Sequence, residues 1–256
     1  MTTIKKYSVI VFVAFTMILS GLLLLFQLSI PSTQGYSISF PQFAPGLVAV
    51  PLLLLLGDQA GLAAMLGHIH LKGLATTLIL AFVLIGASAL VLTLLHIPFR
   101  PWSGNLSFYG INLLFILLGC LGEEIGWRGF MLPKLQKRFS PFVSAVIVGA
   151  VWGVWHLNFS FGFWGFLFYT ITVIELSILF TWLYHKSGGS VLLMGLLHFF
   201  INLFSHVLLW ERFGLLLYVA QTLIFGLICC ALVIRNKPMF FYKASNASSH
   251  SSKVIF

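Results

Sequence analysis

The chain has 256 residues, of which 60% are hydrophobic and only 7% carry a charge. An ordinary soluble domain is about 25% charged, so this chain has too few polar side chains to coat a water-exposed surface, and lipid must be its main solvent. The formal charge of +9 comes from basic residues scattered between apolar runs, which argues against nucleic-acid binding and favours contact with anionic membrane lipids.

Eight apolar runs are long enough to cross about 30 Å of hydrocarbon. The first run follows Lys5 and Lys6 and is interpreted as a retained helix rather than a signal peptide, because it is long enough to span. The second run is interrupted by Pro45, Pro51 and Asp58, so its backbone needs neighbouring helices. The sequence therefore predicts an all-α polytopic membrane protein of about eight transmembrane helices. The runs lie near residues 7–30, 44–66, 73–96, 108–132, 141–158, 163–185, 189–210 and 213–235.

The basic residues indicate an orientation, since an even number of spans places both termini on one side. With the N-terminus cytoplasmic, twelve Lys and Arg residues face the cytoplasm and two, Arg100 and Arg212, face outside. The twelve are Lys5, Lys6, Lys72, Arg128, Lys134, Lys137, Arg138, Lys186, Arg235, Lys237, Lys243 and Lys253. We expect a multi-pass protein of the cell membrane with both termini cytoplasmic, and its compactness favours a bacterial plasma membrane.

The domain organisation is expected to be simple. Residues 1–243 form a single transmembrane domain, whose motif-bearing core covers about residues 108–205. Residues 244–256 are rich in Ser and are expected to form a short, disordered cytoplasmic tail.

Two of the five acidic residues are adjacent, Glu123 and Glu124, and lie in the fourth predicted span. An ionised carboxylate in lipid is costly, so such a pair indicates function. Helical spacing places Glu124 and Arg128 on one face as an i,i+4 pair, while Glu123 points about 100° away and is free to face a cavity. The structural alternative is an interfacial ion pair at the end of a helix.

Two further polar motifs lie on other predicted spans. Trp152 precedes His156 by four residues in the fifth span, and His198 and Asn202 have the same spacing in the seventh. By itself, each of these motifs could serve only in packing or in hydrogen bonds between helices. Their conjunction with the acid pair predicts an intramembrane site on helices 4, 5 and 7.

These groups suit hydrolysis of an amide bond. A desolvated carboxylate can take a proton from water, a His can share that water, and a His/Asn pair can donate hydrogen bonds to the oxyanion. Glu123, His156 and His198 could equally hold Zn²⁺ with an open fourth position. The residues alone do not decide between a metal-free mechanism and a Zn²⁺ site, so no cofactor is certain.

The order and spacing of the three motifs resemble the CAAX-protease and bacteriocin-processing (CPBP, or Abi) family of intramembrane peptidases. The family pattern is Glu-Glu-x-x-x-Arg, then an aromatic-x-x-x-His, then His-x-x-x-Asn or Asp. The resemblance covers about residues 108–205, and it implies that Glu123 is the general base, with His156 as its partner. It also implies that His198 and Asn202 form the oxyanion pair.

The remaining motif residues are implied to organise the site rather than to react. These are Glu124, Arg128 and Trp152. Trp152 stands where the family usually has Phe, and we expect its larger ring to narrow the site without removing chemistry. Because some family members are described as metalloproteases, the resemblance leaves the cofactor open.

The main hypothesis is an intramembrane endopeptidase that cleaves a membrane-associated peptide or protein. Family precedents are prenyl-CAAX cleavage and the maturation of, or immunity to, bacteriocins. The alternative is a non-catalytic membrane scaffold that binds another membrane protein, such as a sensor kinase. A transporter using Glu123 and Glu175 as proton relays is disfavoured, because the sequence shows no internal repeat.

The hypothesis carries a geometric requirement. Counted from the predicted cytoplasmic ends, Glu123 and His198 lie about 14–16 Å deep, whereas His156 lies about 24 Å deep. A common site requires a strongly tilted fifth helix, or a fifth helix that begins below the surface, with residues 133–142 dipping into the membrane.

Overall fold

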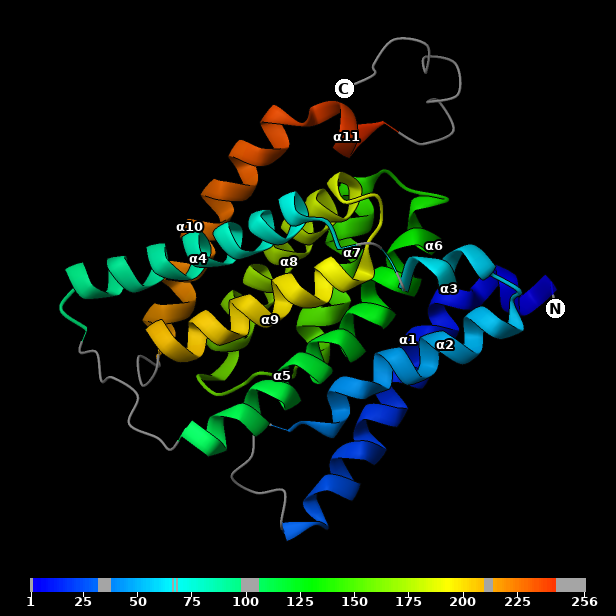
Figure 1. The fold of residues 1–256 in the computed structure, drawn as a ribbon, viewed down its shortest axis with the longest axis horizontal. Coiled ribbons are helices and arrows are strands. Elements are labelled where there is room, and N and C mark those ends of the chain that lie inside the picture. Colours follow the sequence, from blue (N-terminus) through cyan, green and yellow to red (C-terminus); the bar gives the residue numbers. More distant parts are fainter. Residues whose placement is uncertain are drawn as a thin grey trace.

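The computed structural model describes residues 2–31, 38–65, 67, 69–97, 106–209 and 214–242, and all regular structure in these ranges is helical. Figure 1 shows a bundle in which α5 and α9 run through the middle, with α1 and α2 on one side and α10 on the other. The elements are α1 (Thr2–Leu28), η2 (Phe40–Phe43), α2 (Ala44–Leu55), α3 (Gln59–Met65), α4 (Leu71–Leu94), α5 (Leu106–Gly126), η3 (Trp127–Met131), α6 (Leu132–Gln136), α7 (Pro141–Trp155), α8 (Gly162–Lys186), α9 (Val191–Leu208), α10 (Leu215–Arg235) and α11 (Lys237–Phe241).

The prediction of an all-α membrane protein is confirmed. Six helices within the described residues are long and apolar enough to cross a membrane. Large apolar side chains on them are exposed, such as Leu25 of α1 (67%) and Leu227 of α10 (74%), an arrangement that suits lipid as the surrounding solvent. The six are Lys5–Leu28, Leu71–Leu94, Gly110–Gln136, Gly162–Lys186, Val191–Leu208 and Leu215–Arg235.

The predicted number of eight spans is not confirmed. The second and fifth predicted spans correspond to shorter apolar helices, Phe40–Leu55 and Pro141–Trp155. The first ends before Gly57, whose φ of 62° departs from helical geometry, and the second ends before Leu157, whose φ is 46°.

The predicted orientation rests partly on residues that lie outside the described ranges. The two basic residues assigned to the outer side, Arg100 and Arg212, are among them, as is the predicted tail, 244–256. The cytoplasmic location of both termini therefore stays a prediction.

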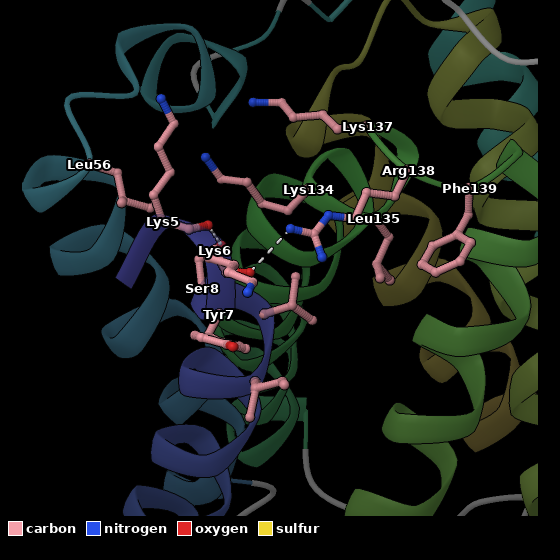
Figure 2. A pocket seen from close by; sticks show the side chains of 12 residues that line it. Lys5, Lys6, Tyr7, Ser8, Leu56, Lys134, Leu135, Lys137, Arg138 and Phe139 are labelled. Carbon is pink, nitrogen blue, oxygen red and sulfur yellow. Dashed lines mark hydrogen bonds between the residues drawn. The ribbon is translucent and has the colours of Figure 1, made fainter. Parts of the chain in front are cut away.

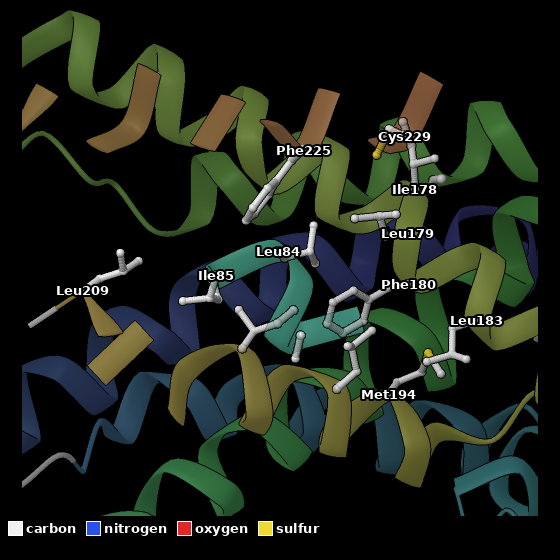
Figure 3. Packing of buried hydrophobic residues seen from close by; sticks show 14 of the residues in the cluster. Leu84, Ile85, Ile178, Leu179, Phe180, Leu183, Met194, Leu209, Phe225 and Cys229 are labelled. Carbon is white, nitrogen blue, oxygen red and sulfur yellow. The ribbon is translucent and has the colours of Figure 1, made fainter. Parts of the chain in front are cut away.

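Two hydrophobic clusters hold the bundle together. The first joins α4, α8, α9 and α10, and Figure 3 shows Leu84, Phe180 and Phe225 packed within it. The second joins α1, α2, η3 and α7 through side chains that include Phe12 and Trp127. Trp152, a motif residue of α7, belongs to the second cluster.

Three glycines on one face of α5 allow an unusually close approach of the η2–α2 segment. A Cβ at Gly122 would lie 2.9 Å from the carbonyl oxygen of Gln42, and one at Gly126 would lie 2.7 Å from the carbonyl carbon of Pro45. The third, Gly119, faces the side chain of Gln42. Small residues at helix interfaces let backbones approach in this way. The glycine face thus brings Gln42 next to the acid pair.

The end of α5 passes directly into a π-helical segment, η3, and then into α6. π-helical turns inside α-helices are rare and occur frequently at functional sites. Here the segment carries Arg128, and all five of its residues are buried.

We expect Gly126→Ala to lower the free energy of unfolding by about 1–3 kcal/mol, because its Cβ would overlap the backbone of Pro45. Gly110→Ala, on the same helix, is the matched control, since a Cβ there meets nothing within 4 Å. Thermal unfolding in detergent measures both. Equal unfolding midpoints for the two variants would show that the approach of η2–α2 to α5 is not tightly packed.

Candidate active site

A cavity of about 390 Å³ is lined by all four of the predicted catalytic side chains. Glu123 comes from α5, His156 directly follows the last residue of α7, and His198 and Asn202 come from α9. The difference in depth expected from the sequence therefore does not separate these groups. The helix α7 has only 15 residues and ends at the cavity instead of continuing past it.

The carboxylate of Glu123 is fully buried and is oriented by two donors from other segments. Nε2 of Gln42 donates to Oε1 over 3.0 Å, and Nε1 of Trp152 donates to Oε2 over 2.7 Å. Each carboxylate oxygen keeps further lone pairs for a water molecule. Glu123 is thus positioned against the cavity by both η2 and α7.

The imidazole of His156 is held in one tautomer by its own helix. Nδ1 lies 2.8 Å from the carbonyl oxygen of Trp152, and because a carbonyl can only accept, Nδ1 carries the proton. In the neutral ring Nε2 is then the acceptor. The edge of the ring packs against Tyr169, whose ring centroid is 5.2 Å away. His156 can therefore accept a hydrogen bond from water.

Behind the cavity wall lies a buried network of Glu124, Arg128 and His198. Oε1 of Glu124 is 2.8 Å from NH1 of Arg128 and 3.0 Å from Nδ1 of His198. Glu124 and Arg128 are fully buried and do not line the cavity. The guanidinium carbon lies over the rings of Trp152 and Phe180, at 4.4 and 4.3 Å from their centroids. This position suits the organising role that the resemblance implies.

His198 and Asn202 both line the cavity from one face of α9. The carboxylate of Glu124 accepts from Nδ1 of His198, which leaves Nε2 available. Nδ2 of Asn202 donates to Sγ of Cys120 over 3.3 Å, which leaves its second amide hydrogen.

Some cavity residues were not predicted from the sequence, and Gln42 is the most important because it bonds to Glu123. The glycines of α5 could have indicated that another segment approaches closely, although not which one. The sequence predicted that the large ring of Trp152 narrows the site. It did not indicate the hydrogen bond that the indole N–H donates to Glu123, which Phe cannot make. Glu175, proposed in the transporter hypothesis, is not among the lining residues.

The predicted metal ligands do not fit a Zn²⁺ site in this arrangement. Within the described residues, no group of three or more His, Cys, Asp or Glu side chains is placed to hold a metal ion. Both oxygens of Glu123 instead accept from uncharged donors.

Breaking the buried pair should be costly, because one charge would be left uncompensated. We expect Glu124→Ala to lower the free energy of unfolding by about 3–5 kcal/mol. The double variant Glu124→Ala/Arg128→Met removes both charges and should cost less than the sum of the single changes Glu124→Ala and Arg128→Met. Thermal unfolding in detergent compares the three variants, and additive effects would contradict a direct interaction.

Comparison with known proteins now adds to this geometry. Residues 105–204 match the family described as type II CAAX prenyl endopeptidase, Rce1-like. A curated protein named CAAX prenyl protease 2, from Methanococcus maripaludis, is 29% identical over 65% of this chain and 68% of its own length. The family match spans the residues that carry all three motifs. Through its motif-bearing residues 105–204, the chain is therefore similar to the CAAX-protease (CPBP) family.

Proposed function

We propose that this protein is an intramembrane endopeptidase that hydrolyses a peptide bond in a membrane-associated peptide or protein. The observation that carries the proposal is the convergence of one carboxylate, two imidazoles and one amide, from three helices, on a single cavity. The family match supports this activity class, and the name of the relative points to prenylated CAAX sequences as the substrates.

The composition of the cavity supports a lipid-linked substrate. Away from the polar groups its walls are apolar, with side chains from α4, α8, α9 and α10. Ligand sites typically combine such apolar walls with a few convergent polar groups. We infer that the apolar part holds the lipid or apolar side chains of the substrate. These wall residues include Ile85, Val173, Leu176, Ile201, Leu209, Leu217 and Phe225.

In the proposed reaction, Glu123 takes a proton from a water molecule, whose oxygen attacks the carbonyl carbon of the peptide bond. Nε2 of His156 accepts a hydrogen bond from the same water and directs it. The proton held by Glu123 then passes to the leaving amine as the carbon–nitrogen bond breaks. Gln42 and Trp152 keep the carboxylate in position throughout.

The developing oxyanion would be stabilised from α9. The amide of Asn202 donates one hydrogen bond, and Nε2 of His198 donates another when the ring is protonated on both nitrogens. The carboxylate of Glu124 orients the same ring, because it accepts from Nδ1. The second glutamate of the pair thus assists the reaction through His198.

Replacement of the reacting groups tests the proposal. Glu123→Gln, His156→Ala and His198→Ala should each lower kcat by about 10²-fold or more, since positioned acid–base groups contribute about that much. The assay is cleavage of a prenylated CAAX peptide by the purified protein in bilayers, with and without a chelator. Glu175→Gln, in the same bundle but outside the cavity, is the control and should remain active. Full activity in all three variants would refute the peptidase and favour the scaffold.

The two donors to Glu123 have a separate test. Trp152→Phe keeps an aromatic ring but removes the indole N–H, and Gln42→Leu removes the other donor. A hydrogen bond to a charged group contributes about 1.5–3 kcal/mol, so each change should lower kcat by about 10-fold or more. Because neither donor is expected to bind substrate, KM should change little. A rise in KM with constant kcat would instead place these residues in substrate binding.

A further inference from the structure

A second cavity, of about 600 Å³, lies between the start of α1 and the segment that contains α6 and the turn after it. It shares no lining residue with the active-site cavity. Figure 2 shows the α1 residues Lys5 and Lys6 facing Lys134 and Arg138. We call it the basic pocket, because five of its twelve lining residues are cations, Lys5, Lys6, Lys134, Lys137 and Arg138, and none is acidic.

Little of this positive charge is compensated by the protein. Lys134 forms an ion pair with Asp58, and this interaction lowers the pKa of the carboxyl group. Arg138 donates to the backbone carbonyl oxygen of Lys6 over 3.3 Å, which ties α6 to α1 but leaves its charge unpaired. No carboxylate in the described residues forms a salt bridge with Lys6 or Lys137, and only the charge of Asp58, already paired with Lys134, acts on Lys137 from a distance. The pocket is therefore suited to an anion supplied from outside the chain.

The position of the pocket indicates where that anion comes from. Lys5 begins a candidate membrane span and Lys134 lies near the end of another, so the cations lie at the ends of spanning helices. The pocket also has apolar walls, and two of these residues are open to the surroundings, Ile10 (66% exposed) and Phe139 (41% exposed). A cationic centre with exposed apolar walls matches a charged headgroup that carries acyl chains. A free phosphate would use only the cations.

We propose that the basic pocket binds the phosphate of an anionic phospholipid. Basic pockets between transmembrane helices are suitable sites for such headgroups. Lys6, Lys137 and Arg138 neutralise the phosphate, while Ile10 and Phe139 contact the acyl chains. Bound lipid then links α1 to the segment that follows the Glu123–Glu124 motif.

The test is a titration of the full-length protein, in neutral detergent, with short-chain phosphatidylglycerol, followed by native mass spectrometry. The pocket variant combines Lys6→Gln, Lys137→Gln and Arg138→Gln, and leaves Lys134 in place so that its pair with Asp58 persists. The control variant removes the same charge elsewhere, through Lys72→Gln, Lys186→Gln and Lys237→Gln. None of these three residues lines the basic pocket.

We expect the pocket variant to bind phosphatidylglycerol at least about 10-fold more weakly, since each basic residue near an anionic lipid contributes measurably to binding. The control variant should bind it like the wild type. Equal weakening in both variants, or none in either, would refute the site. Glycerol 3-phosphate and phosphatidylcholine distinguish the source of the anion. Binding of glycerol 3-phosphate as tight as that of the lipid would overturn the assignment to a phospholipid.

The folded state of the pocket variant is checked by its thermal unfolding midpoint, which should equal that of the control variant. The single variant Lys137→Gln, at an exposed position, provides a second measurement that does not depend on the triple change. It should also weaken phosphatidylglycerol binding, and wild-type affinity in this variant would contradict the proposed contact. Peptide cleavage is not the readout, so failure here is distinguishable from failure of the peptidase proposal.

Discussion

The buried ion pair between Glu124 and Arg128 is the interaction on which the candidate site depends. Neither side chain is exposed, so removing one partner would leave a charge with no solvent to stabilise it. The guanidinium lies over the rings of Trp152 of α7 and Phe180 of α8, and the carboxylate also accepts from His198 of α9. One pair therefore fixes the relative positions of α5, α7, α8 and α9 around the cavity.

Adjacent glutamates can perform different tasks because one residue along a helix is a rotation of about 100°. Glu123 points to the cavity, and its carboxylate accepts hydrogen bonds from two neutral donors, Gln42 and Trp152. Glu124 points into the bundle, where Arg128 balances its charge. This separation gives one carboxylate suited to accept a proton from water and one that keeps the surrounding helices in place.

Most of the candidate site could be predicted from the sequence, because its motif residues are i,i+4 pairs or neighbours on apolar helices. Local spacing is enough to place such pairs on one helix face. Gln42 could not be predicted, since it reaches Glu123 only through the contact between η2 and the glycines of α5. The second and fifth spans were also misjudged in length, because an apolar run does not reveal where a backbone leaves helical geometry, as it does at Gly57 and Leu157.

The sequence by itself determined the solvent, the helical class and the identity of the motif residues, because a continuous apolar run of spanning length satisfies its backbone in lipid as a helix. It also indicated the family. Only the tertiary structure decided that Glu123 and His156 reach the same cavity, because that depends on where α7 ends. The tertiary structure likewise decided that cations separated by more than a hundred residues, such as Lys6 and Arg138, share one pocket. Distances between helices arise from packing, and no spacing within a helix encodes them.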